Sequence, residues 1–136
     1  MVTSTLSEPE KARLLHTARE ALPRAYAPYS GVRVGAAVLT AKGQVYSGSN
    51  VENASYGLTL CAERAAIAGA VATEGPGMRI KALAVVSDQA GPFPPCGACR
   101  QVIYEFGPEA LVIFPGEEGL ISAPITELLP HAFRLR

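Results

Sequence analysis

Residues 80–106 read IKALAVVSDQAGPFPPCGACRQVIYEF, and this stretch decides the kind of fold. Its first part, residues 80–87, is almost continuously apolar and is typical of a buried strand. A turn-rich loop with several prolines follows it, and a helix is expected from Gly97 to Phe106, where Gly107 is well placed to end it. A strand that leads through a loop into a helix is a building unit of α/β domains.

The elements on either side repeat this alternation. Upstream, the sequence predicts a capped helix from Ser7 to Pro23, strands at 32–40 and 44–48, a long polar loop at 49–60 and an alanine-rich helix at 61–71. Downstream, it predicts strands at 111–114 and 119–122 and a helical turn at 125–129. We therefore expect a three-layer α/β/α sandwich around one mixed five-stranded sheet, its first two strands antiparallel and its middle ones parallel. The 136 residues predict a single domain over 1–136, with 1–6 flexible.

Composition excludes several classes of function. The 12 basic and 12 acidic residues balance, so no net charge attracts nucleic acid or anionic lipid, and we expect neither a polynucleotide nor a membrane as partner. No run of about 18 apolar residues is present, and residues 1–6 lack the pattern of a signal peptide. The three cysteines cannot all pair within one chain. A cytoplasmic protein with reduced cysteines is expected, and there clustered cysteines bind metal or perform chemistry.

The spacing of the cysteines indicates which of these uses applies. Cys96-Gly97-Ala98-Cys99 alone fits either a zinc knuckle or a thioredoxin-like redox pair. Cys61 opens a different predicted helix and is followed two residues later by Glu63. Helix starts favour negative charge and therefore thiolates. Three thiolates bind zinc and leave its fourth tetrahedral position open to water, beside which a glutamate can move protons.

The three cysteines also fit two other interpretations, a structural zinc site and a thiol redox pair. A purely structural zinc needs a fourth protein ligand, and the only imidazoles are those of His16, on the first predicted helix, and His131, in the tail. Such a site would make the chain a non-catalytic module that binds a partner. A thiol redox protein would use Cys96 and Cys99 alone, with no need for Cys61 or the glutamate.

The pattern C-x-E … P-C-x-x-C is a signature of zinc-dependent nucleobase deaminases. On this pattern the chain resembles the small class of cytidine deaminases that have three cysteine ligands and act on free nucleosides. The resemblance extends from the first helix to the tail. It covers residues 25–30, 34–37, 50–56, 61–64, 95–101, 128–130 and Phe133.

The resemblance implies a role for each matching residue. Cys61, Cys96 and Cys99 hold one Zn²⁺ per chain, and Glu63 is the catalytic acid and base. The remaining implied site residues contact substrate or metal ligands: Asn50 and Glu52 bind the ribose, Ala62 meets the pyrimidine edge through its backbone, Tyr56 and Phe133 wall the pocket, and Arg64 binds the cysteine sulfurs. Val32 departs from the pattern, because many relatives carry a phenylalanine there that packs on the pyrimidine ring.

The implied activity is zinc-dependent hydrolytic deamination of cytidine and deoxycytidine to uridine and deoxyuridine, with release of ammonia, in pyrimidine salvage. The resemblance further implies a homotetramer in which Phe133 reaches a neighbouring subunit's site. A deaminase of the nucleoside antibiotic blasticidin shares the zinc motif and is the nearest alternative. A polynucleotide deaminase is disfavoured, because the short, neutral chain has no basic run to follow phosphates.

Overall fold

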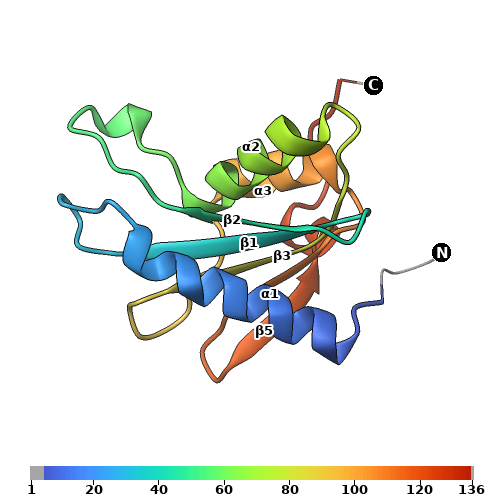
Figure 1. The fold of residues 1–136 in the computed structure, drawn as a ribbon, viewed down its shortest axis with the longest axis horizontal. Coiled ribbons are helices and arrows are strands. Elements are labelled where there is room, and N and C mark those ends of the chain that lie inside the picture. Colours follow the sequence, from blue (N-terminus) through green and yellow to red (C-terminus); the bar gives the residue numbers. More distant parts are fainter. Residues whose placement is uncertain (1–4, 136) are drawn as a thin grey trace.

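The computed structural model describes residues 5–135 and contains one five-stranded sheet with strand order β2-β1-β3-β4-β5. Helices cover both faces of this sheet (Figure 1), which confirms the three-layer α/β/α sandwich. The strands are β1 (Val34–Thr40), β2 (Val45–Ser49), β3 (Ile80–Ser87), β4 (Leu111–Pro115) and β5 (Leu120–Pro124). The helices are α1 (Glu8–Ala21), α2 (Ala62–Glu74), α3 (Gly97–Phe106) and α4 (Ile125–Leu128), with 3₁₀ turns η1 (Leu22–Arg24) and η2 (Tyr56–Leu58).

The chain enters α1 through the expected capping box. The Ser7 hydroxyl accepts a hydrogen bond from Glu10 N at 3.1 Å, and the Glu10 carboxylate accepts one from Ser7 N at 3.0 Å. These bonds satisfy two of the backbone donors at the helix start. The segment 1–6 that was expected to be flexible lies largely outside the described residues, and Leu6, which is described, packs against the core on the α1 side.

Two apolar clusters hold the layers together. On one face, α1 packs on the sheet through buried residues that include Leu14, Ala18, Ala37, Ala84 and Ile113. On the other, α2, α3 and α4 share a second cluster, which includes Ala66, Ile67, Leu83, Ile103 and Ile125. Because both faces of β1 are covered, all of its residues are buried, including the polar Thr40.

The direction of the strands brings two helix starts to the same end of the sheet. β1 pairs antiparallel with both β2 and β3, and β3 pairs parallel with β4. The middle strands of the chain, β2, β3 and β4, therefore run in one direction as expected, although β1 lies between β2 and β3. The crossovers from β2 to β3 and from β3 to β4 run through α2 and α3. Both helices consequently begin at the carboxyl end of the strand before them, where ligands bind in such sheets.

Close backbone packing sets the position of α2. A Cβ atom at Gly48 of β2 would lie 2.4 Å from Ala66 N and 2.5 Å from Ala62 O, both in the backbone of α2. Only glycine allows the helix to approach the strand this closely. Gly48 therefore helps to determine where the first turn of α2 lies.

Some boundaries differ from the prediction for local reasons. The first strand begins at Val34 rather than Val32, because the Asn50 side chain takes the hydrogen bonds of Val34 N and Val32 O, each at 2.9 Å. The second major helix continues to Glu74, where the Glu74 carboxylate accepts bonds from Thr40 Oγ1 at 2.8 Å and Tyr46 OH at 3.1 Å. Within residues 5–135, no helix combines the length and the apolar character needed to cross a bilayer.

Candidate active site

The three cysteine sulfurs form one cluster at the shared starts of α2 and α3. The Sγ atoms of Cys61, Cys96 and Cys99 all lie within 4.8 Å of one another. Cys61 and Cys96 are the N-cap residues of their helices, and Cys99 lies in the first turn of α3. Tetrahedral zinc with Zn–S bonds of about 2.3 Å separates its sulfurs by about 3.8 Å, so this arrangement fits zinc.

Among the described residues, no histidine or carboxylate joins the three sulfurs closely enough to complete a four-ligand site. His131 lies in the exposed tail after Pro130, in a left-handed backbone conformation with φ 54°. His16 is exposed on α1 and pairs with Glu20 at 3.2 Å. The fourth position of a zinc ion held by these sulfurs is thus left for water or substrate, as in catalytic zinc sites.

Electrostatics at the cluster favour the thiolate form of Cys61. The Arg64 Nη2 atom donates a hydrogen bond to Cys61 Sγ at 3.1 Å. A hydrogen bond from Cys99 and the Arg64 charge lower the pKa of Cys61 to about 5. The same Cys61–Cys99 contact, together with burial, raises the pKa of Cys99. A divalent ion would let all three thiols ionise, since its charge offsets their mutual repulsion.

Glu63 lies in the first turn of α2, two residues after Cys61, and only 3% of its surface is exposed. Burial is the main reason that its pKa rises to about 7, and the Cys61 charge adds to the rise. A carboxyl group with this pKa exchanges protons near neutral pH, which suits general acid–base chemistry. Ala62, between the two, is fully buried as the first residue of α2, where backbone N–H groups lack partners within the helix.

Asn50 is buried and bonded to its own chain at both ends of its side chain. Its Oδ1 accepts from Val34 N and its Nδ2 donates to Val32 O. One amide hydrogen and one oxygen lone pair remain available for a ligand. Val32, which Asn50 holds in place, is half-buried and packs against the core on the side of α2 and α3.

Glu52 and Tyr56 line one cavity of about 370 Å³, together with Tyr29, Ser30, Asn53 and Thr59. The Glu52 carboxylate accepts hydrogen bonds from Tyr29 N at 2.9 Å, from Ser30 N at 3.1 Å and from the Ser30 hydroxyl. The rings of Tyr29 and Tyr56 meet edge to face, with centroids 6.1 Å apart. Sequence reasoning assigned no role to Tyr29 or Ser30. Both residues lie in a segment, 25–30, that the family resemblance covers, and the turn-forming residues around them predict a loop, but neither signal indicates what the loop contacts.

Phe133 does not join this cavity within one chain. It is 69% exposed, on a tail that Gln101 of α3 holds through a 3.0 Å hydrogen bond from Nε2 to Phe133 O. With Gln101, Tyr104 and Leu135 it lines a different cavity, of about 730 Å³. The structure therefore brings together the cysteines, Glu63 and Arg64, and separately Glu52 and Tyr56, while Phe133 stands apart.

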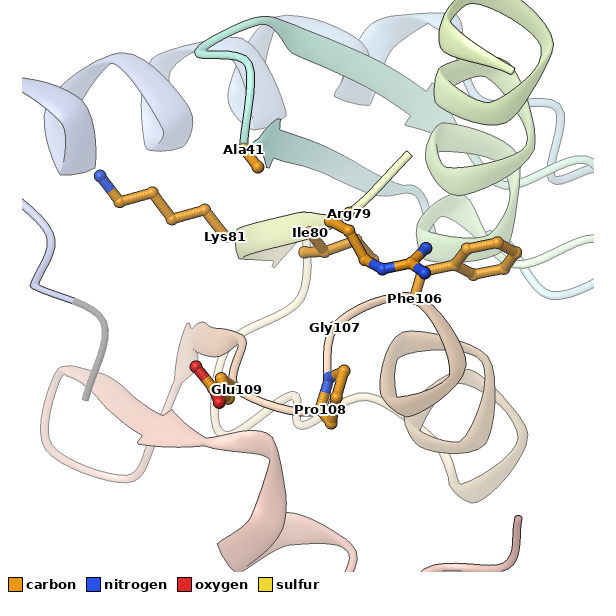
Figure 2. Close-up of a pocket in the computed structure, with 8 residues that line it drawn as sticks. All are labelled: Ala41, Arg79, Ile80, Lys81, Phe106, Gly107, Pro108 and Glu109. Carbon is orange, nitrogen blue, oxygen red and sulfur yellow. The ribbon is translucent and has the colours of Figure 1, made fainter. Parts of the chain in front are cut away.

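A further pocket, of about 430 Å³, lies at the far end of α3 from the cysteines (Figure 2). Residues at the start of β3 and at the end of α3 line it, among them Ile80 and Phe106. Figure 2 shows the side chains of Arg79 and Lys81 extending in opposite directions. Lys81 Nζ is paired with Glu10 at 3.1 Å. These two cations do not converge on a common ligand, so we assign no chemistry to this pocket.

Comparison with known proteins places this geometry in a family. Residues 8–114 match the model of the cytidine and deoxycytidylate deaminase zinc-binding region. The chain is 45% identical over 126 residues to a cytidine deaminase of Halalkalibacterium halodurans, covering 91% of this chain and 94% of the relative. The crystal structure of cytidine deaminase from Mycobacterium tuberculosis superposes with a TM-score of 0.82 at 43% identity, covering 93% of this chain and 98% of that one.

The chain thus belongs to the cytidine and deoxycytidylate deaminase zinc-binding family, and it is a zinc-dependent hydrolytic deaminase. A blasticidin-S deaminase of Bacillus cereus is also similar, at 29% identity over 110 residues, 71% of this chain and 74% of that one. Membership of the family favours the catalytic zinc reading over the redox and partner-binding alternatives.

Proposed function

We propose that the chain deaminates cytidine and deoxycytidine by hydrolysis, giving uridine or deoxyuridine and ammonia, and that it serves pyrimidine salvage. The observation that carries this proposal is the cluster of three thiols together with the buried Glu63 carboxyl group, which lies two residues after Cys61 in the first turn of α2. Zinc is assigned to Cys61, Cys96 and Cys99, and the acid–base role to Glu63. Asn50, Glu52, Ala62, Tyr56, Val32 and Phe133 are assigned to substrate, and Arg64 to the sulfurs.

In the proposed mechanism, Glu63 moves protons between water and the pyrimidine. Zinc held by Cys61, Cys96 and Cys99 would lower the pKa of a water molecule so that hydroxide is available near neutral pH. Glu63 accepts a proton from this water and delivers it to N3 of the ring, which makes C4 electrophilic. The water oxygen bonds to C4, and Glu63 carries the second proton of this water to the amino group; the C4–N bond then breaks, ammonia leaves, and the oxygen becomes the C4 carbonyl of the product. The pKa of about 7 that burial gives Glu63 suits both transfers.

The remaining assignments place the sugar and the base. Glu52 lines a cavity whose hydrogen-bonding side chains include those of Ser30, Asn53 and Thr59, and its Oε2 accepts only the Ser30 hydroxyl, which leaves one lone pair for a ribose hydroxyl. The Ala62 backbone N–H is offered to the pyrimidine edge at the helix start. Val32 covers less area than an aromatic ring and cannot stack on the base, which leaves the ring face more open than in relatives with phenylalanine.

We further propose that four chains assemble and that Phe133 completes the site of a neighbour. Its 69% exposure and its separation from Glu52 and Tyr56 support this assignment, since within one chain Phe133 contributes to no cavity with them. The cytoplasm is the proposed compartment, because the ligand thiols must stay reduced to bind metal.

The test compares substrates while counting metal. Purified protein is assayed for ammonia release from cytidine, deoxycytidine and blasticidin S, and its zinc content is measured. We expect one zinc per chain and turnover of both nucleosides, with little or none of blasticidin S. Turnover of blasticidin S with none of cytidine would favour the alternative deaminase. Zinc far below one per chain in an active preparation would contradict the assigned metal site.

A further inference from the structure

Helix α3 presents two of the clustered cysteines and, directly after them, two side chains that hold the C-terminal segment. Cys96 and Cys99 lie at its start, and Arg100 and Gln101 follow at once. The side chains of Arg100 and Gln101 reach three backbone carbonyls, those of Pro95, Leu128 and Phe133. None of these contacts has a place in the proton transfers described above.

The first hydrogen bond of Arg100 reaches the loop between β3 and α3, residues 88–96, which is called the metal loop below because it ends at Cys96. Arg100 Nε donates to Pro95 O at 2.7 Å. Pro95 is fully buried and immediately precedes Cys96, the N-cap of α3. The bond therefore fixes the peptide plane from which the Cys96 side chain departs.

The second hydrogen bond of Arg100 reaches the last residue of α4. Arg100 Nη1 donates to Leu128 O at 2.8 Å. Leu128 is the last residue of α4, where carbonyls lack partners within the helix, and its side chain packs against the core. Because a guanidinium group is planar and rigid, its two donors set the metal loop and the end of α4 at a defined separation.

A second contact continues along the same segment. Gln101 Nε2 donates to Phe133 O at 3.0 Å, so residues 128–133 are attached to α3 at both ends. Arg100 is thus the side chain shared by the metal loop and the segment that leads to Phe133, whereas Gln101 contacts the tail alone.

We propose that Arg100 is a positioning residue that couples the Cys96 side of the zinc site to the C-terminal segment carrying Phe133. It orients the metal loop through Pro95 and anchors the segment through Leu128. Loss of the guanidinium loosens both at once. This inference rests on the zinc site of the proposed function, and it adds a residue that touches neither metal nor substrate.

The experiment measures zinc and the tail separately in the full-length protein loaded with zinc. Zinc release to a chromogenic chelator reports the metal site, and hydrogen exchange of residues 129–135, followed by mass spectrometry, reports the tail. For Arg100→Met we expect zinc release to accelerate by about 10–100-fold, the range typical of groups that orient metal ligands. Exchange of residues 129–135 should rise in the same variant.

Three companion variants keep the test decisive. Arg100→Lys retains the charge but loses the planar set of donors, so it should shift both readouts in the same direction as Arg100→Met. It provides the test if Arg100→Met does not fold. Gln101→Ala should increase exchange in the tail and leave zinc release unchanged. Arg19→Gln, on the exposed side of α1, is the matched arginine control and should resemble wild type in both.

Folded Arg100→Lys protein that releases zinc at the wild-type rate would overturn the proposal. So would faster zinc release with unchanged exchange in the tail, because the two would then not be coupled. A wild-type protein that binds no zinc would contradict the proposed function itself, and this proposal with it. A wild-type protein with full zinc content and unaffected Arg100 variants would contradict the coupling alone.

Discussion

Glu52 combines two tasks at the level of a single side chain. Its carboxylate binds the backbone of Tyr29 and Ser30, which fixes the loop opposite the segment at 50–60, and it also faces the cavity assigned to ribose. Asn50 also combines two tasks. Its side chain holds the entry to β1 through Val34 N and Val32 O, and it is one of the residues proposed to bind the ribose. Replacing either residue therefore affects the shape of the pocket as well as its contacts.

A pH dependence follows from the bonds to Glu52. The hydrogen bond from the Ser30 side chain, with backbone bonds from Ser30 and Tyr29, lowers the pKa of Glu52 below its ordinary value of 4.5. A lowered folded-state pKa stabilises the protein above about pH 4.5, and this contribution is lost as the pH falls through the folded-state pKa. We expect Glu52→Gln to reduce the wild-type loss of stability below pH 4.5, measured as urea unfolding midpoints from pH 7 to pH 3.

The matched control is Glu118→Gln, in the exposed turn between β4 and β5, which should keep the wild-type pH profile. An unchanged profile in Glu52→Gln would show that the carboxylate does not hold the 29–30 loop in solution.

At the level of elements, the close contact between β2 and α2 sets the position of the first turn of α2, which carries Glu63. The Gly48 position meets the backbone of α2 at Ala62 and Ala66 with no room for a side chain. We expect Gly48→Ala to push the first turn of α2 away from the sheet and to destabilise the fold by about 1–3 kcal/mol, as overpacking does. Because Cys61 and Glu63 lie in that turn, zinc content and activity should fall further than stability alone explains. Thermal unfolding and zinc analysis check this.

Gly69 provides the control on the same helix. A Cβ atom there meets nothing within 4 Å, so Gly69→Ala should be neutral or stabilise by about 0.5–1 kcal/mol through helix propensity. Equal effects of the two substitutions would contradict the role given to the close approach at Gly48.

The sequence predicts those elements whose signals are local. The strand at 80–87 and the helix from Gly97 to Phe106 appear at the expected residues, and the Ser7 capping box forms as its residues predict. Side-chain contacts between distant segments carry no local signal. The start of β1 at Val34 depends on Asn50, and the place of β1 between β2 and β3 depends on the crossover through α2.

The same distinction between local signals and contacts of distant segments applies to the candidate site. Cysteine spacing and Glu63 predict the metal cluster, because each helix start is visible in the sequence and the crossovers bring the two starts together. The contacts of Glu52 with Tyr29 and Ser30, and those of Arg100 with Pro95 and Leu128, join residues that no periodicity relates. Only the folded chain reveals them.

At the level of the whole molecule, the surface carries large apolar side chains in exposed positions. Tyr56 is 75% exposed, Leu58 70% and Phe133 69%. The loop that holds Tyr56 and Leu58 extends from the body of the chain at one end of the sheet (Figure 1). Apolar side chains gathered on a projecting loop are typical of a surface that meets another protein. These positions agree with the proposed assembly, in which Phe133 would complete the site of a neighbouring chain.

Mixing two defective variants tests this sharing. If Phe133 serves a neighbour's site, Glu63→Ala and Phe133→Ala chains that are reassembled together regain activity, because some sites then combine an intact Glu63 with an intact neighbouring Phe133. In a random equal mixture, about a quarter of the sites are complete, since each of the two requirements is met about half the time. Ammonia release before and after joint refolding measures it, with light scattering to give the mass of the assembly.

Each variant refolded alone is the control for that experiment. Activity that never exceeds the mean of the two separate samples, in an assembly shown to contain both chains, would assign Phe133 to its own chain or to no site.

The central claim is that Glu63 moves protons at a zinc site formed by three cysteines. The most direct measurement is the deamination rate of Glu63→Ala at saturating cytidine, with zinc content determined on the same sample. Our account predicts wild-type zinc content and fold with a kcat reduced by at least about 10²-fold, the lower end of what general acid–base catalysis contributes. A zinc-loaded, folded variant with a kcat close to that of wild type would contradict it.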